Sequence, residues 1–574
     1  MYIKQLQLRN FRSFADFNIT FRPGLNLLVG ENNIGKTHVI DALRMVLSQG
    51  SGRRDIYPRE TDIRHDSDAN RVADGFEIIV TFSGLSTEQI GWFVQMMIPA
   101  EGSDIARLTL KYHKAVGRQN REYFATKIWG GDKDGPAIES EILDSLRCVF
   151  LQPLRDAVAD LRPGRMSRTA ALLENLADKA DREKIEEVVD KANKEIECAK
   201  VIKDANQRLN DNLQAICGSS LAQKSQLVLS DPSFRRIVQS VRTLVGSNTP
   251  FDVDENGLGY NNLLYAATVL AEIKEALTDG VDLGVLLIEE PEAHLHPQLQ
   301  SPFVRYLDSQ ASDSVQVIAT THSSVVASSV GVERSTVIHK DRLELPSISV
   351  QAKPLSDCGL STSELRLLSR YLDVTRSCML FARGVVLVEG ISEALLLPIF
   401  AEQLGLNLRD YAVNVVNVNG LSFAPFYRIF KDGNVKIPCA VITDGDPVAE
   451  SDGVSGTYEH GSRAKDVIAD LDGYCKPFIA RRTFEYELAL CGNEVHMASL
   501  FKTRHPKLGE ELEDKLTMVT TAEEKALAVQ EYICRKATYK ADLAHDLLIS
   551  SEGGLISLFV PDYIADAIRF AAGQ

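Results

Sequence analysis

The fold is decided by the stretch Leu25-Asn-Leu-Leu-Val29-Gly30-Glu-Asn-Asn-Ile-Gly35-Lys36-Thr37. Its apolar first half predicts a buried strand, and the apolar spacing over 39–46 predicts a helix directly after it. The loop between them fits G-x4-G-K-[ST], in which glycines let backbone N–H groups curl around phosphates. Lys36 would then reach the β- and γ-phosphates, and the Thr37 hydroxyl would hold Mg²⁺. The residues expected to form the nucleotide cradle are Gly30, Asn32, Asn33, Gly35, Lys36 and Thr37.

A second set of nucleotide-site residues is predicted some 250 residues later. The apolar run 285–288 ends in Glu289-Glu290, which would place both acids at the carboxyl edge of a parallel sheet. We expect Glu289 to support Mg²⁺ and Glu290 to polarise an attacking water. A further strand over 315–321 ends at His322, which would touch the γ-phosphate.

The rest of the chain divides by texture. Strand patterns cover 1–30, 76–82 and 105–129, whereas 165–245 carries apolar residues at helical spacing with charges on the other faces. This helical insertion is either a dimerisation module or a plain subdomain. The region 340–380 is mixed and predicts a link. From 384, apolar strands alternate with helices, which predicts a second α/β unit with parallel strands.

Composition limits the possible classes of protein. The chain has 574 residues, 44% hydrophobic and 25% charged, which is typical of a globular multidomain protein. Neither a signal peptide nor a run long enough to cross a membrane is expected. The nine cysteines form no CxxC pair, which favours the cytoplasm and argues against a cysteine zinc site. A net charge of −16 counts mildly against broad nucleic-acid affinity.

The N-terminal motifs resemble the ABC ATPases of the SMC and RecF kind. The opening 8–14, LRNFRSF, is similar to the first strand of that class, and Gln152 resembles its Q-loop residue. The segment 251–267 departs from the usual Leu-Ser-Gly-Gly signature and is similar to a Gly-x-Gly-x-x-Asn-Leu-Leu variant, matched by Gly257, Gly259 and Asn262. In the class, this segment binds the γ-phosphate of nucleotide held by a partner subunit. The resemblance therefore implies a dimer with composite nucleotide sites.

Acidic residues follow two strands of the second α/β unit. Glu389 ends the first strand, and Glu393 lies about one helical turn further on. Asp444 and Asp446 stand at the tip of the strand over 439–443. Oxygen-only ligands of this kind select Mg²⁺ or Mn²⁺, and two such ions would stabilise in-line hydrolysis of a phosphodiester.

This acidic arrangement resembles a Toprim domain, and its pairing with the ATPase motifs resembles the OLD (overcoming lysogenization defect) nucleases. Over 482–488, RTFEYEL is similar to the family's Thr-Leu-Glu-Tyr segment, which implies Glu485 as a further metal ligand. Lys536 matches the lysine of its Lys-x-x-Phe segment, which implies a role in stabilising charge on the scissile phosphate. Lys540 is a rival for that role.

The expected fold class is therefore α/β: an ABC-type P-loop ATPase domain with a helical insertion, followed by a Toprim (Rossmann-like) nuclease domain. The resemblance implies an ATP-regulated, metal-dependent DNA endonuclease of anti-phage defence, working as a homodimer or higher oligomer. It also implies a possible partner, a helicase or retron components, which the sequence does not identify. The alternatives are a RecF-like repair ATPase without nuclease activity, a topoisomerase or a primase. The predicted domains are 1–155 and 249–375 (ATPase), 156–248 (helical insertion) and 376–574 (Toprim).

Overall fold

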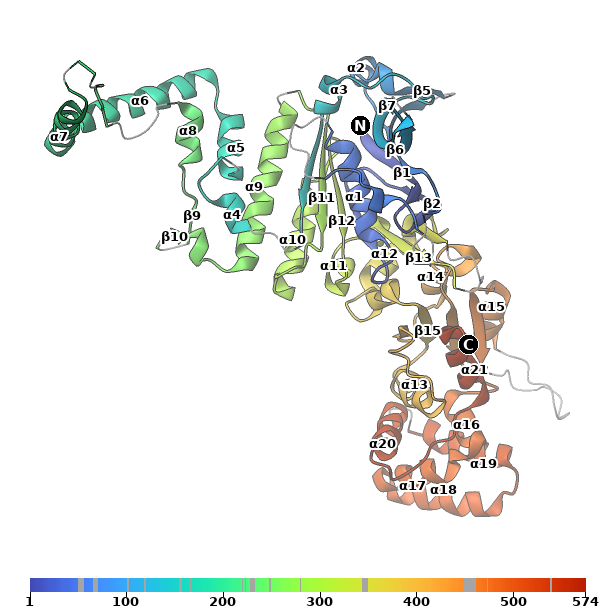
Figure 1. Ribbon diagram of the computed structural model, residues 1–574. Coiled ribbons are helices and arrows are strands. Elements are labelled where there is room, and N and C mark those ends of the chain that lie inside the picture. Colours follow the sequence, from blue (N-terminus) through green and yellow to red (C-terminus); the bar gives the residue numbers. More distant parts are fainter. Residues whose placement is uncertain are drawn as a thin grey trace.

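The structure is a computed structural model of the chain (Figure 1). It describes residues 1–49, 56–65, 71–100, 103–117, 120–153, 157–165, 167–218, 220–221, 223–227, 233–246, 249–278, 280–342, 349–446, 461–471, 473–536 and 539–574.

A six-stranded sheet, here called the P-loop sheet, organises the N-terminal half in the order β14-β13-β3-β12-β11-β8. Its strands run parallel except at the edge, where β14 is antiparallel to β13. The central strand β3 is wholly buried, as its mainly apolar sequence predicts, and the polar Asn26 is buried with it. The strands are β3 (Leu25–Val29), β8 (Leu146–Leu151), β11 (Leu283–Glu289), β12 (Val315–Thr320), β13 (Ser335–Lys340) and β14 (Val350–Pro354).

Helices cover both faces of the P-loop sheet. One face packs on α1 (Lys36–Leu47), and the other packs on α9 (Leu258–Thr278), α10 (Pro297–Gln310) and α11 (Ser324–Ser329). A doubly covered parallel sheet places every strand's carboxyl end at one edge. The loop after β3 and the acids after β11 therefore meet at that edge.

An antiparallel sheet encloses the other side of α1. Its order is β2-β1-β4-β6-β5, with β7 paired to β6. Alternate residues face α1, so its apolar side chains and those of the helix share one core. The strands predicted over 76–82 and 105–129 are confirmed. The elements are β1 (Tyr2–Phe11), β2 (Phe14–Thr20), β4 (Gly75–Ser83), β5 (Met97–Ala100), β6 (Ser103–Val116) and β7 (Glu122–Gly130), with α2 (Thr87–Trp92) and α3 (Ser140–Asp144) at its margin.

A helical arm projects from the body of the molecule, with α6 and α7 at its outer end (Figure 1). Its apolar side chains include exposed ones, among them Val188, Val201 and Ile216. The helical spacing of the sequence is thus confirmed, although the arm buries little of its own apolar surface. The arm comprises α4 (Ala157–Leu161), α5 (Arg168–Leu176), α6 (Lys179–Glu197), α7 (Lys200–Cys217) and α8 (Phe234–Gln239), followed by the short strands β9 (Leu244–Val245) and β10 (Phe251–Asp252).

A four-stranded, wholly parallel sheet forms the C-terminal unit in the order β16-β15-β17-β18. Both faces are covered, one by α13 and α21 and the other by α14 and α15. The strands are β15 (Gly384–Val388), β16 (Val413–Asn417), β17 (Cys439–Thr443) and β18 (Cys475–Ile479); the covering helices are α13 (Ile391–Gln403), α14 (Ala424–Tyr427), α15 (Ser462–Asp470) and α21 (Asp562–Ala572).

Further helices extend the C-terminal sheet at the end away from the P-loop sheet (Figure 1). They pack into the same core as α13 and α21, so they belong to this unit. They are α16 (Phe484–Leu488), α17 (Glu494–Arg504), α18 (Pro506–Met518), α19 (Ala522–Cys534) and α20 (Lys540–Glu552).

The region 340–380 does more than link the two sheets. It adds the edge strand β14 and the helix α12 (Thr362–Tyr371), and Leu355, Leu368 and Met379 are buried. These side chains join one hydrophobic core that runs from the P-loop sheet to β15 and β17. A shared core of this kind holds the two α/β units in a defined relation.

Gly384, at the start of β15, gives a test of this packing. A Cβ atom there would lie 1.9 Å from the carbonyl oxygen of Ala571 at the end of α21, and both elements are buried. We expect Gly384→Ala to lower the free energy of unfolding by about 3 kcal/mol, measured by urea denaturation. Gly473→Ala is the control, because a Cβ there meets no atom within 4 Å. Equal stability of the two variants would contradict the packing.

Candidate nucleotide and metal sites

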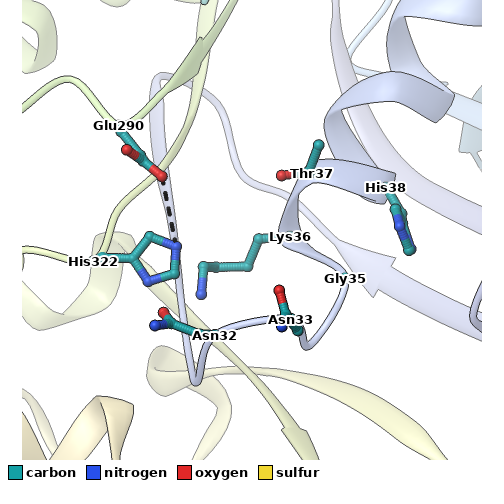
Figure 2. Close-up of a pocket in the computed structure, with 8 residues that line it drawn as sticks. All are labelled: Asn32, Asn33, Gly35, Lys36, Thr37, His38, Glu290 and His322. Carbon is teal, nitrogen blue, oxygen red and sulfur yellow. Dashed lines mark ion pairs between the residues drawn. The ribbon is translucent and has the colours of Figure 1, made fainter. Parts of the chain in front are cut away.

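The loop after β3 curls around an open cavity of about 730 Å³ at the carboxyl edge of the P-loop sheet (Figure 2). Gly30 and Gly35 adopt φ values of +144° and +108°, which favour glycine and bring the loop's backbone round to the start of α1. The helix N-terminus and the loop amides therefore face a space suited to phosphate groups. The cavity is lined by Asn32, Asn33, Gly35, Lys36, Thr37, His38, Glu290 and His322.

Lys36 lies inside this cavity with only 4% of its surface exposed. Its ammonium group donates hydrogen bonds to the carbonyl oxygens of Gly30 at 2.6 Å and Glu31 at 2.8 Å. Burial lowers the pKa of Lys36 to about 8, against the opposing effect of Glu290 and Glu31. An arriving phosphate would supply the negative charge that favours the ammonium form.

Glu290, directly after β11, lines the same cavity, whereas Glu289 is the last residue of β11 and is not among the lining residues. Glu289 is 9% exposed, its carboxylate lies near enough to the Thr37 hydroxyl for Thr37 to counteract the raised pKa, and its Oε1 atom is buried without a hydrogen-bond partner. Burial raises the pKa of Glu289. A buried carboxylate with a spare oxygen, next to the exposed Thr37 hydroxyl, would suit the oxygen-only ligation that Mg²⁺ prefers. The fold thus brings Thr37 and Glu289 near each other, and their role in holding Mg²⁺ stays a prediction.

Glu290 and His322 point toward each other in the cavity, and Lys36 lies next to His322 (Figure 2). The His322 Nε2 atom lies 3.9 Å from Glu290 Oε1, and burial lowers the pKa of His322, with Lys36 adding to this effect. Glu290 has a φ of +47°, an uncommon value for a residue with a side chain, which turns its carboxylate toward the cavity. The sequence did not single out Glu292, whose Oε1 accepts from the Thr321 hydroxyl and from the amides of His322 and Ser323.

Gly257, Gly259 and Gln152 do not line the nucleotide cavity. Gly259, in the first turn of α9, lies against the loop after Glu290, where a Cβ would approach the His294 carbonyl to 2.7 Å. A Cβ at Gly257 would meet no atom within 4 Å, so its backbone faces open space. Gln152 is exposed after β8.

Acidic side chains gather at the carboxyl edge of the C-terminal sheet. Glu389, directly after β15, accepts a hydrogen bond from the Thr443 hydroxyl at 3.2 Å. The Glu393 carboxylate lies beside Gly390, where a Cβ would come within 3.1 Å of its Oε2 atom. Asp444, after β17, accepts from the amide of Phe484 at 2.9 Å. We call Glu389, Glu393, Asp444 and Glu485 the carboxylate cluster.

Burial and the negative charges of the cluster raise the pKa of two of its members, Asp444 and Glu393. Burial and the neighbouring charges of Glu393, Glu485 and Glu389 raise the pKa of Asp444 to about 8. Burial, with Glu485 and Glu389, raises the pKa of Glu393 to about 7. Both effects express an excess of negative charge in a buried place, which a divalent cation would relieve.

Lys540, and not Lys536, contacts the cluster. Lys540 is the first residue of α20, and its ammonium lies 3.0 Å from Glu485 Oε2. Its positive charge counteracts the raised pKa of Asp444 and Glu393. Lys536 is exposed in the turn after α19. Of the two lysines that the sequence left open, the fold brings Lys540 to the carboxylates.

Asp446 is exposed at the tip of the loop, with a φ of +37°. Its amide and that of Gly445 both donate to the Arg482 carbonyl, and a Cβ on Gly445 would lie 2.3 Å from the Ala480 carbonyl. The glycine thus lets the backbone lie against the end of β18, and Asp446 is not among the main charges that shift the pKa of Asp444. Across the described ranges, no three acidic, histidine or cysteine side chains stand close enough to hold a metal ion without moving. The predicted acids are therefore neighbours, not a preformed ligand set.

Comparisons with known proteins match both units. A family model described as "AAA domain" matches residues 5–226, and one described as "AAA ATPase domain" matches 159–327. The model "Overcoming lysogenization defect protein-like, TOPRIM domain" matches 380–446. An OLD nuclease of Thermus scotoductus is 25% identical over 431 residues, which cover 73% of this chain and 77% of that protein. Together these matches support an OLD-family ATPase–Toprim protein.

Two further likenesses accompany this OLD-family assignment. The endonuclease GajA of Bacillus cereus is 22% identical over 549 residues, covering 79% of this chain and 78% of GajA. The solved C-terminal region of the Burkholderia pseudomallei OLD protein aligns at 23% identity with a TM-score of 0.26, covering 33% of this chain and 98% of that one. The predicted order, an ATPase followed by a Toprim domain in an α/β fold, is confirmed. No helix in the described ranges has the length and apolar character needed to cross a membrane.

Proposed function

We propose that this OLD-family chain is a metal-dependent DNA endonuclease whose cutting is regulated by ATP. The observation that carries the proposal is the buried carboxylate cluster beside Lys540, in the same chain as a P-loop cavity. Relatives named OLD nuclease and endonuclease GajA, each covered over three quarters of its length, support it.

The chemistry proposed for the cluster follows from its oxygen donors. Bound Mg²⁺ or Mn²⁺ ions, two in the proposed arrangement, would supply the positive charge and the activated water that phosphodiester hydrolysis requires. Glu389, Glu393, Asp444 and Glu485 would hold them, with Asp446 drawn in from the loop. The Thr443 hydroxyl orients Glu389, and the Phe484 amide orients Asp444. Lys540 would bind the scissile phosphate and stabilise the charge that builds on it.

Lys540→Met gives a direct test of this assignment. Removing the ammonium group while keeping the apolar stem should slow cleavage by about 100-fold, because a charge-stabilising donor would be lost. The rate is measured as plasmid nicking under single-turnover conditions. Lys536→Met is the matched comparison, and its cleavage rate should fall by about tenfold or less. A larger loss in Lys536→Met would return the role to Lys536.

We propose that the P-loop cavity binds ATP with one Mg²⁺ held by Thr37 and Glu289, and that Glu290 and His322 flank the γ-phosphate. The proposed ATPase residues are 1–155 and 249–375, the arm is 156–248, and the Toprim domain is 376–574. The exposed apolar residues of the arm support its use in joining two copies. In such a homodimer, Gly257 and Gly259 would face the partner's nucleotide.

The deciding experiment is cleavage of supercoiled plasmid by the purified chain. Nicking or linearisation should require Mg²⁺ or Mn²⁺, stop on chelation, and change with the nucleotide present. ATP hydrolysis without any cleavage would favour a RecF-like repair ATPase. The DNA replication and repair protein RecF of Bacillus cytotoxicus is 36% identical to this chain over 147 residues.

We also propose a role in anti-phage defence, exercised in the cytoplasm on invading DNA. The support is the family resemblance. Cells that carry the chain should form fewer plaques than cells that carry an Asp444→Asn variant. Equal plaque counts would remove this role without affecting the enzymatic proposal.

A further inference from the structure

An ionic contact joins the nucleotide loop to the start of the C-terminal sheet. Glu31, inside the P-loop, accepts from Arg342 Nη2 with both carboxylate oxygens at 2.9 Å. Its Oε2 atom also accepts from Arg383 Nε at 2.5 Å, across 352 positions of sequence. The Glu31 side chain is 12% exposed, whereas that of Arg383 is 48% exposed. Arg383 is thus the more accessible partner of a mostly buried carboxylate.

The same glutamate contacts the lysine that would bind phosphate. The Glu31 carbonyl accepts from the Lys36 ammonium, so one residue meets the nucleotide site with its backbone and Arg383 with its side chain. Arg383 also lines a cavity of about 530 Å³ that shares Asn32 and His322 with the nucleotide cavity. Phosphates entering the P-loop would therefore compete with Glu31 for Arg383 and draw Lys36 away from the Glu31 carbonyl.

Arg383 is directly followed by β15, whose other end carries Glu389. The five residues of β15 are wholly buried between β16 and β17, and Gly384 is fitted closely against α21. The Arg383 amide is itself bonded to the Ala412 carbonyl, just before β16. A strand so enclosed moves as a unit, so a displacement at Arg383 is passed to Glu389.

We propose that Arg383 is a positioning residue that transmits the nucleotide state of the P-loop to the carboxylate cluster through β15. The inference rests on the proposed function, since it names the contact through which ATP would regulate cutting. Glu31 holds Arg383 in the structure. Bound nucleotide changes that contact, and Glu389 shifts relative to Asp444 on the neighbouring strand.

The test compares Arg383→Gln with two variants in the full-length protein. Arg383→Lys keeps the positive charge. Arg22→Gln removes a similarly exposed arginine, 49% exposed and paired with Asp357, away from the P-loop. Plasmid cleavage with Mn²⁺ is measured without nucleotide and with a saturating non-hydrolysable ATP analogue, and the ratio of the two rates is the response. ATP affinity is measured separately by calorimetry.

In the wild type and in Arg22→Gln, the ATP analogue should change the cleavage rate by about tenfold, either up or down. In Arg383→Gln, the rates with and without the analogue should differ by about twofold or less. Arg383→Lys should recover most of it, and the Kd for ATP in Arg383→Gln should stay within about fivefold of wild type. A full response in Arg383→Gln, or its loss in Arg22→Gln as well, would overturn the proposal.

Hydrogen–deuterium exchange separates this inference from the proposed function. Peptides covering β15 and 389–393 are compared with and without the ATP analogue, which requires no cleavage. If wild type cuts no DNA, the endonuclease proposal fails, and exchange alone decides the coupling. A nucleotide-dependent change present in wild type and absent in Arg383→Gln supports the transmission; the same change in both, or no change in wild type, overturns it.

Discussion

Asp444→Asn is expected to reduce metal-dependent DNA cleavage by about 1000-fold, because it removes a carboxylate that would be ionised on binding a divalent cation. Asp444 is acted on by Glu393, Glu485 and Glu389 together, so it is the carboxylate best placed to share a cation with the others. Asparagine has nearly the same shape, and its oxygen can still accept from the Phe484 amide. The change therefore removes charge with little effect on packing, and Glu389→Ala should give a comparable loss.

The stability of Asp444→Asn provides its control. At neutral pH the unfolded chain ionises Asp444, whereas the folded chain disfavours the ionised form, because the pKa of Asp444 is raised to about 8. The free energy of unfolding therefore falls as the pH rises from about 4 to about 8. Asparagine removes this cost, and its Tm in a chelating buffer at neutral pH should be at least that of wild type. A folded variant with unaltered cleavage would refute the nuclease assignment. ATP affinity should not change, because the P-loop cavity is separate.

Sequence was most informative where the residues of a site are close together in the chain. The strand, glycine loop and helix of the P-loop are contiguous, so periodicity and turn chemistry place Lys36 and Thr37 without tertiary information. Strand-end acids are similar: an apolar run predicts the strand, and parallel order brings Glu389 and Asp444 to one edge. Glu485 came only through the family resemblance, because no local pattern connects it to the acids before it.

What sequence left open depends on contacts between distant segments. Lys536 lies in the turn after α19 and Lys540 begins α20, and only the folded chain shows that Lys540 meets Glu485. The region 340–380 has no strong periodicity, yet its apolar residues complete a core between two sheets. The pairing of Glu31 with Arg383 likewise has no signature in either local sequence. Asp446 is two residues from Asp444 in sequence, but it is exposed, whereas Asp444 lies among the charges of the cluster.

Lys36→Ala is expected to weaken ATP binding by about 100-fold, measured by calorimetry or by a fluorescent ATP analogue. A hydrogen bond to a charged group contributes about 1.5–3 kcal/mol, and the ammonium would meet more than one phosphate oxygen. Because Lys36 is buried and its pKa is lowered to about 8, the folded protein bears the cost of holding this cation before nucleotide arrives. Alanine removes that cost and leaves the Gly30 and Glu31 carbonyls open to water.

The control is Lys4→Ala, which removes an exposed lysine from β1 and should leave the Kd for ATP unchanged. The nucleotide response of cleavage should disappear in Lys36→Ala at ATP concentrations that saturate wild type, and return in part at higher concentrations. That return matters, because it separates weakened binding from a damaged Toprim site, where no amount of ATP would restore the response. An unaltered dissociation constant would remove the P-loop assignment, and with it the route by which Glu31 and Arg383 could sense nucleotide.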